Sequence, residues 1–287
     1  MMRLLRERKG LQLFGLMLPG GFWLIVFFLL PIAVIGVISL MGRDDLGSPT
    51  LPLTLDAYIE SFDPIYLELF VFSIWLSFLT TIATLVIAMP VALFITRLPK
   101  KWRNTMVFLV MIPFWTNFLV RTYALLFLMR ANGPINNALM DLKLIAEPLS
   151  LLSTPFAVWI GLVYGNLPFM ILPLYSSLEK FDWTLIEAAQ DLGANTSKAF
   201  FRIMLPLTAP GLLAGSILTF VPAVGSYITV ELMGGGKTTM IGRVIATQFG
   251  TAGNWPLGSA MSIVLMVIVT IAALLYFRAG RGERMAL

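Results

Sequence analysis

Six long stretches of this 287-residue sequence contain no charged residue, and this feature limits the fold more than any other. The stretches are Leu11–Gly42, Leu69–Thr96, Asn104–Val120, Pro148–Leu178, Ile203–Val230 and Val244–Phe277. A helix needs about 20 apolar residues to cross roughly 30 Å of membrane hydrocarbon. Five stretches reach that length, and the third reaches it when extended to Met129 with one charge, Arg121, included. The sequence therefore predicts six transmembrane spans.

The composition excludes several other classes of protein. Only 12% of the residues are charged and 58% are hydrophobic, whereas soluble domains are about a quarter charged. A soluble enzyme, a disordered chain and a secreted disulfide scaffold therefore fit poorly. If these stretches were buried helices of a large soluble protein, amphipathic helices would have to cover them, and a β-barrel would need alternating strands of about 10 residues. The six long apolar stretches leave room for neither. We expect an all-α, polytopic transmembrane helical bundle that forms a single transmembrane domain over residues 1–287.

The absence of Cys and His limits the chemistry that this chain could perform. The chain has no Cys and no His, so it has no thiolate nucleophile, no His-containing triad and no metal site built on either residue. We expect no metal or cofactor in this chain.

The basic residues predict the topology, because cytoplasmic loops are enriched in Lys and Arg. Fourteen of the twenty fall on one side: Arg3, Arg6, Arg8, Lys9, Arg97, Lys100, Lys101, Arg103, Lys180, Lys198, Arg202, Arg278, Arg281 and Arg284. Only five fall in the other loops: Arg43, Arg130, Lys143, Lys237 and Arg243. Both termini are thus expected in the cytoplasm, with an uncleaved first span. The net charge of +5 then reflects topology and gives no support for nucleic-acid binding.

The longest cytoplasmic loop, Ser177–Pro206, contains a set of helix signals. Trp183–Leu192 is expected to form a short helix, with Thr184 as its N-cap and Glu187 as the capping-box partner. Gly193 suits the left-handed conformation that ends many helices. The loop therefore predicts a short helix that stops abruptly.

One face of this helix is suited to a partner. Ala188 and Ala189 are small, so another surface could approach closely, and Glu187 and Asp191 lie one turn apart as two anionic contacts. An ordinary amphipathic connector is the alternative interpretation.

The second half of the loop is expected to return the chain to the membrane. Asn195 or Thr196 would cap the next helix. Ile203 and Leu205 would pack the hairpin onto the spans, and Pro206 would fix the turn into the fifth span.

The spacing of these residues resembles the signature loop of ABC-importer permeases. The loop reads Glu187-Ala188-Ala189, three residues, Gly193, nine residues, Ile203, one residue and Leu205-Pro206, and every fixed position matches. The resemblance implies a MetI-like type I permease fold over essentially the whole chain. It also implies that Glu187–Leu192 is a coupling helix that inserts into a separate ATPase subunit. ATP and Mg would then be bound by an ATPase dimer, and this chain would perform no chemistry.

Further motifs resemble spermidine/putrescine permeases, in particular the B/H-type subunit that pairs with a different permease chain. They are Pro113–Tyr123, Leu167–Met170, Pro173–Tyr175, Leu232–Gly235, Asn254–Pro256 and Asp63–Tyr66. The segment Gly225–Tyr227 departs from the pattern. The resemblance implies polyamine import in a bacterial inner membrane, with a periplasmic binding protein delivering substrate. Related permeases for iron, opines or aminophosphonates share much of the pattern and stay open as alternatives.

Two charges fall within or near spans, where charge is costly and usually faces an interior. Arg121 and Glu231 could pair with each other, or Glu231 could meet a cationic substrate. Alternatively, Arg121 reaches the headgroups or holds helix ends, and Glu231 lies at the interface outside the path.

Other polar and aromatic residues are weaker candidates for the substrate path. Trp115, Tyr123, Tyr227 and Trp255 could stack on alkylammonium groups, or they could form the usual aromatic belt. Asn117 and Asn166 would stabilise helix contacts or line the path.

Three other functions are considered. A secondary transporter would need acidic or His relays within its spans, and a membrane-embedded enzyme would need converging acids or a nucleophile. The sequence shows neither. Gly234–Thr238 resembles part of a P-loop, but the position that needs the first Gly holds Glu231, so we expect a turn there.

Overall fold

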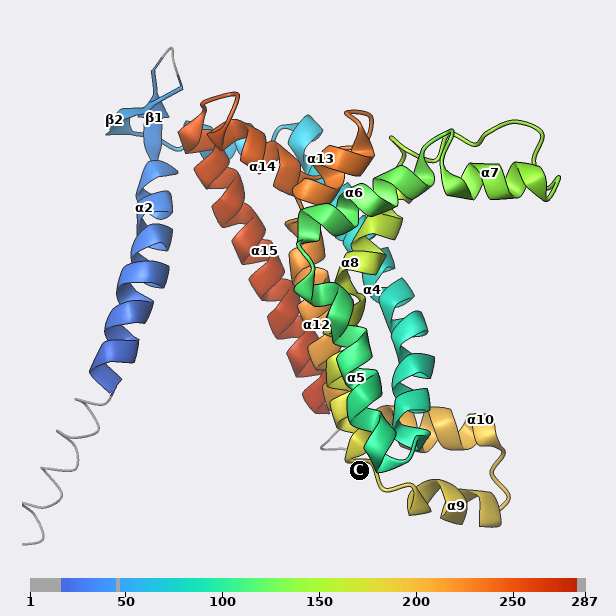
Figure 1. The fold of residues 1–287 in the computed structure, drawn as a ribbon. Helices are drawn as coiled ribbons and strands as arrows, with labels where there is room; N and C mark the ends of the chain where they lie inside the picture. The colour runs from blue at the N-terminus through green and yellow to red at the C-terminus, as the bar shows by residue number, and fades with distance from the viewer. Residues whose placement is uncertain (1–16, 45–46, 283–287) are drawn as a thin grey trace, which may run out of the picture. The chain divides into compact units, whose positions relative to one another are not determined.

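The computed structural model describes residues 17–44 and 47–282, and most of them are helical (Figure 1). Within these residues, four helices are long and apolar enough to cross a membrane: Met17–Ile38, Pro64–Arg97, Pro155–Glu179 and Trp255–Tyr276. Two bent helix pairs raise the number of spans to six if each pair is one span. The predicted all-α bundle is therefore confirmed. Arg3, Arg6, Arg8, Lys9 and Arg284, which contribute to the predicted topology, lie outside the described residues.

The third and fifth predicted spans differ from continuous helices. Lys100–Trp115 meets Phe118–Asp141 at 87°, and Thr196–Leu207 meets Ala209–Val224 at 70°. At the first bend, the Asn117 side chain accepts a 2.8 Å hydrogen bond from the Leu119 N–H. Such side chains satisfy the backbone groups that a break exposes, which is why an apolar run can be interrupted there.

The chain divides into two compact units, which are described in turn; the single-domain organisation stays a prediction. The described part of the first unit comprises residues 17–44, 47–63 and 245–266. A π-helical turn, η1 (Ile25–Leu29), leads into α2 (Leu30–Ile38). An antiparallel hairpin follows, β1 (Met41–Arg43) and β2 (Pro49–Leu53), which the sequence did not predict. A short helix, α3 (Asp56–Ser61), follows the hairpin.

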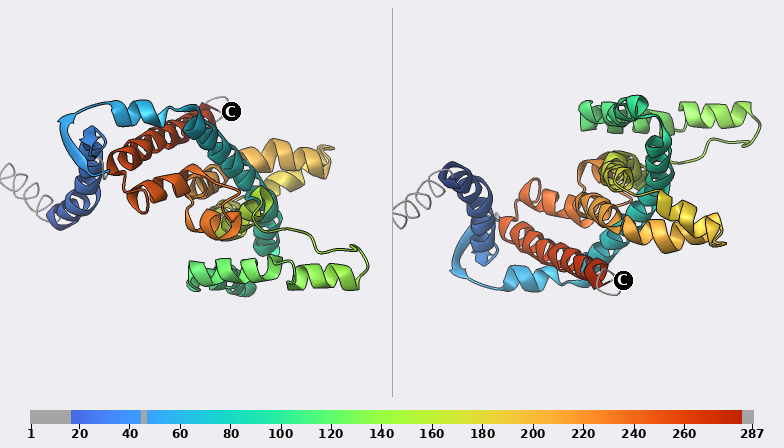
Figure 2. Two further views of the ribbon diagram at one scale, coloured as in Figure 1. Left: turned by 90° about the horizontal axis from the view of Figure 1, so that it is seen from above. Right: turned by 90° about the horizontal axis from the view of Figure 1, so that it is seen from below.

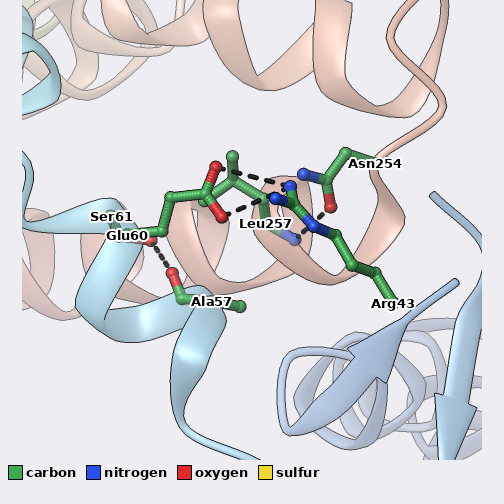
Figure 3. A network of polar contacts seen from close by, with 6 residues as sticks. All are labelled: Arg43, Ala57, Glu60, Ser61, Asn254 and Leu257. Carbon is green, nitrogen blue, oxygen red and sulfur yellow. Dashed lines mark hydrogen bonds and ion pairs between the residues drawn. The ribbon is translucent and has the colours of Figure 1, made fainter. Parts of the chain in front are cut away.

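Polar contacts hold this hairpin and α3 together (Figure 3). A nitrogen of the Arg43 guanidinium lies 3.4 Å from a Glu60 carboxylate oxygen. Asn254 accepts a 3.2 Å hydrogen bond from the Leu257 N–H, in the first turn of α15 (Trp255–Gly282). The orientation of α3 on the hairpin is therefore fixed by an ion pair between the two.

The second unit comprises residues 64–244 and 267–282 of the described chain. Its elements are α4 (Pro64–Arg97), α5 (Lys100–Trp115), α6 (Phe118–Met129), α7 (Pro134–Asp141), α8 (Pro155–Glu179), α9 (Thr184–Asp191), α10 (Thr196–Ala199), η2 (Phe200–Met204), α11 (Leu205–Leu207), α12 (Ala209–Val224) and α13 (Ile228–Gly234), with parts of α14 (Ile241–Phe249) and α15. The helices α4, α8 and α12 lie side by side in both views of Figure 2.

Small residues let these helices approach closely. A Cβ atom added at Gly211 of α12 would lie 2.4 Å from the Ser177 Cβ and 2.5 Å from the Pro173 carbonyl oxygen of α8. Apolar side chains of α4 and α8 fill the adjoining core, including Ala92, Leu174 and others. Small residues at such contacts are typical of membrane helix packing.

Buried hydroxyl groups on α4 are satisfied within the helix itself. Ser73, Ser77, Thr80 and Thr84 are fully buried, and each donates a hydrogen bond to the carbonyl oxygen four residues earlier. A polar stripe inside a span is therefore tolerated without leaving an unpaired donor.

The segment Gly234–Thr238 is a turn, as predicted. The helix α13 precedes it, and Gly235 and Gly236 adopt φ angles of 54° and 79°. Because a helix rather than a strand leads into it, this segment lacks the context of a P-loop.

The contact between Gly211 and α8 predicts the effect of one methyl group. Gly211→Ala should destabilise the protein by about 1–3 kcal/mol, because its Cβ would overlap the backbone of α8. Thermal unfolding in detergent measures this change. Gly36→Ala on α2 is the control, since nothing lies within 4 Å of its Cβ position. Equal unfolding temperatures for the two variants would contradict the packing.

Candidate functional site

Two regions of the second unit collect the residues to which the sequence assigns function. One is the hairpin formed by α9 and α10 between α8 and α12, which lies beyond the end of the long helices in Figure 1. The other is a pocket next to the bend between α5 and α6.

The side chain that bonds to the start of α9 is that of Asp182, one residue before the N-cap position Trp183. The predicted N-cap role of Thr184 is wrong, because the helix begins at this residue. The Asp182 carboxylate accepts hydrogen bonds from the Thr184 hydroxyl at 2.7 Å and from its N–H at 3.1 Å. These bonds favour the ionised form, so they lower the pKa of the Asp182 carboxyl below its usual value. An acidic residue at this end is also favoured by the helix dipole.

Gly193 ends α9 as predicted. Its φ angle is +86°, in the left-handed region that side chains with a Cβ rarely adopt. The Gly193 N–H bonds to the Gln190 carbonyl oxygen, and the Ala194 N–H bonds to that of Ala189, both at 2.9 Å. This pair of bonds is the Schellman motif. The abrupt stop therefore follows from a single glycine.

The residues at the far end of α9 face outward. Glu187, Ala188 and Asp191 are exposed, and Ala189 is half-buried. Among the described residues, the side chains of Glu187 and Asp191 form no hydrogen bond or ion pair. Leu192, which the sequence analysis did not single out, is 90% exposed. Its place in the sequence, as an apolar residue directly before the glycine that ends the helix, is the signal that could have identified it.

The other end of the hairpin is anchored to the long helices. Ile203 and Leu205 pack against the core formed by α4 and α8, as predicted. Trp183 packs there too, with the Arg97 guanidinium of α4 lying 5.9 Å from its ring centre. The α9 hairpin is thus attached to α4 as well as to its covalent neighbours.

The return into the membrane bends beyond Pro206. Asn195 caps α10 by accepting a 2.8 Å hydrogen bond from the Lys198 N–H. Pro206 lies within α11, and the 70° bend follows at Thr208. The Thr208 hydroxyl donates to the Met204 carbonyl oxygen at 2.7 Å, which also accepts from the Thr208 N–H, and to the Leu205 carbonyl oxygen at 3.3 Å.

The pocket brings together two of the predicted path residues. It has a volume of about 230 Å³, and both Arg121 and Asn166 line it. The other lining residues come from α5, α6, α8, α12, α13 and the break between α12 and α13: Phe114, Phe118, Gly161, Leu162, Gly165, Phe169, Pro222, Ser226 and Thr229. None of these had been proposed for the path.

Arg121 contacts rings rather than an acid. Its guanidinium lies 4.9 Å from the centre of the Phe114 ring and 5.6 Å from that of Phe118. Its Nε atom is buried and forms no hydrogen bond. The proposed pairing of Arg121 with Glu231 is wrong, because Glu231 forms an ion pair with Arg243. The start of α14 brings Arg243 close to α13.

The remaining path candidates do not converge on this pocket. Asn117 caps α6 with its side chain, so it serves the bend. Trp115, Tyr123 and Tyr227 are exposed, and none of them lines the pocket. Trp255 is exposed as well and belongs to the first unit. Lipid-facing positions would suit these aromatic side chains equally well.

Glycines keep the pocket open on the α8 side. A Cβ at Gly161 would lie 2.6 Å from Met233 and Thr229 side-chain atoms, and one at Gly165 would lie 3.4 Å from the Phe118 ring. Among the described residues, no group of three or more acidic residues could hold a metal ion.

Comparison with known proteins agrees with this architecture. Residues 85–284 match the family of binding-protein-dependent transport system inner membrane components. The chain belongs to this family. Its fold, a helical bundle whose α9 hairpin joins two spans, is that of an ABC-importer permease.

The similarity to known proteins covers nearly the whole chain. The spermidine/putrescine transport system permease protein PotB of Haemophilus influenzae is 42% identical over 90% of this chain and 91% of its own length. PotB of Escherichia coli is 44% identical over 90% of this chain and 94% of its own length. A chain of a bacterial ABC transporter that imports the acidic polysaccharide alginate shares the fold, with a TM-score of 0.77 at 16% identity, over 97% of this chain and 98% of that chain.

Proposed function

We propose that this permease carries polyamines, spermidine or putrescine, across the bacterial inner membrane as one subunit of an ATP-driven importer. The observation that carries the proposal is the 42–44% identity to spermidine/putrescine permeases over 90% of the chain. Import of another small solute, such as an opine, an aminophosphonate or iron, is the second candidate. It rests on the resemblance of the motifs to permeases for these other solutes, which share much of the same pattern.

The pocket residues differ in how well they suit a cationic substrate. Two unit charges 4 Å apart repel by about 4 kcal/mol at an effective dielectric constant of 20. Arg121 therefore does not bind an ammonium group; it orients Phe114 and Phe118. The Arg121 guanidinium already lies over the Phe114 and Phe118 rings, so the amide oxygen of Asn166 is the pocket group that suits a cationic substrate. Glu231 is engaged with Arg243 and would need to leave that ion pair first.

The α9 hairpin supplies the contact with the ATPase. Glu187 and Asp191 offer two anionic contacts, Ala188 allows close approach, and the exposed Leu192 offers an apolar anchor. ATP and Mg would be bound by the ATPase dimer. Displacement of α9 would reach α4 through Trp183 and Arg97, and it would reach α12 through α10 and α11.

The remaining subunits follow from the importer class. A second, different permease chain would complete the path, and a periplasmic binding protein would deliver the substrate. The distribution of Lys and Arg supports cytoplasmic termini and a cytoplasmic α9 hairpin.

The substrate is tested by reconstituting the complete importer in liposomes with its binding protein. We expect ATP-dependent uptake of radiolabelled spermidine or putrescine, with each polyamine competing against the other. A Walker-deficient ATPase is the control and should abolish uptake. Uptake of an opine, aminophosphonate or iron complex with no uptake of either polyamine would reject the polyamine proposal but keep the importer.

Gly193 provides a test of the ATPase contact. Gly193→Val should weaken ATPase association about fivefold to thirtyfold, because a β-branched residue in left-handed geometry costs about 1–2 kcal/mol. No atom lies within 4 Å of its Cβ position, so the effect would come from the backbone rather than a clash. Co-purification and substrate-stimulated ATP hydrolysis measure it.

The matched control is Gly193→Asn, because Asn tolerates the left-handed conformation. This variant should stay close to wild type. If Gly193→Val also retained wild-type association and hydrolysis, α9 would not be the coupling element.

A further inference from the structure

The segment between α2 and α4 exposes an unusual amount of apolar surface. Five large apolar side chains within twelve residues are exposed, and Leu51 and Ile59 reach 76% and 71%. We call these five residues the apolar stripe: Leu51, Leu53, Leu55, Ile59 and Phe62. Nothing in the described part of the first unit covers them, and clustered exposed apolar residues mark a contact with a membrane or a protein.

The members of the stripe are grouped by local geometry. Leu51 and Leu53 are both exposed on β2, where the pairing register shifts between Thr50 and Leu53. Leu55, Ile59 and Phe62 are spaced by four and three residues, which aligns them along one side of the α3 segment. Ala57 and Ser61 are buried on the other side of α3.

Two polar contacts join α3 to the hairpin and to the end of α2. The ion pair between Arg43 and Glu60 binds α3 to the hairpin (Figure 3). The hydroxyl groups of Tyr58 and Ser39 lie 2.8 Å apart and join α3 to the end of α2. The stripe therefore stays on the outside of this unit.

The chain places this segment at the surface of the membrane. Met17–Ile38 has 22 residues and is about 33 Å long at 1.5 Å per residue, which matches the hydrocarbon thickness. The strand β1 begins at Met41, three residues after this span ends, and the spanning helix α4 begins at Pro64. Exposed apolar side chains are found along α2 and at Leu40, just before the hairpin, so the stripe continues an apolar surface of the span.

We propose that the stripe lies in the membrane–water interface, with its side chains among the upper acyl carbons. Asp56 is exposed beside the stripe and would face water, which makes the segment amphipathic in the manner of an interfacial helix. The segment thus anchors the connection between two spans to the lipid surface. This role does not depend on which substrate the importer carries.

The chain contains no Cys, so single-cysteine variants can be labelled selectively. The assembled importer would carry a bimane label at Ile59→Cys or, as the matched control on the same helix, at Asp56→Cys. Both positions are exposed. After reconstitution in nanodiscs, quenching is compared between ordinary phosphatidylcholine and phosphatidylcholine brominated near the top of its acyl chains.

We expect the brominated lipid to quench the Ile59→Cys label at least about twofold more than the Asp56→Cys label. Leu53→Cys on β2 should behave like Ile59→Cys, and it replaces that variant if assembly fails. Equal quenching at the stripe and control positions would overturn the proposal. A label at Ile59 that escapes both the lipid and an aqueous iodide quencher would also overturn it, because a protein partner would then cover the stripe.

Discussion

The structure depends on one constraint, which is that hydrocarbon offers no hydrogen bonds to the backbone. Long apolar runs must therefore form helices, and any break needs a local acceptor or donor. The two bends of the bundle meet this requirement with short polar side chains. Asn117 accepts from the Leu119 N–H at one bend, and the Thr208 hydroxyl donates to the Met204 and Leu205 carbonyl oxygens at the other. The pocket beside Asn117 exists because the helix turns there.

The same constraint explains why the α9 hairpin differs from the rest of the permease. Outside the hydrocarbon, a short helix needs defined ends, and Asp182 and Gly193 supply them. Leu192 stays exposed at the stop while Ile203 and Leu205 pack inward. One end of the hairpin is therefore free for another subunit, and the other end is attached to α4 and α8.

Much of the fold could be predicted because the signals are long or local. Charge-free runs identified the spans, and the glycine at 193 and the asparagine at 195 identified helix boundaries. Features that depend on tertiary contacts could not be predicted. The partner of Glu231 is Arg243 only because α14 folds back beside α13. The lining of the pocket combines residues from five helices and a helix break, and no sequence spacing relates Phe114 to Thr229.

The docking of the ATPase on the α9 hairpin is tested most directly by protection of Leu192. Leu192→Cys should react freely with a maleimide in the permease alone, since this side chain is 90% exposed. In the assembled importer its reaction should slow at least about tenfold, because burial in a protein groove excludes the reagent. Leu142→Cys, exposed in the same unit at the end of α7, should react at an unchanged rate. Equal labelling of Leu192→Cys with and without the ATPase would contradict docking at this hairpin.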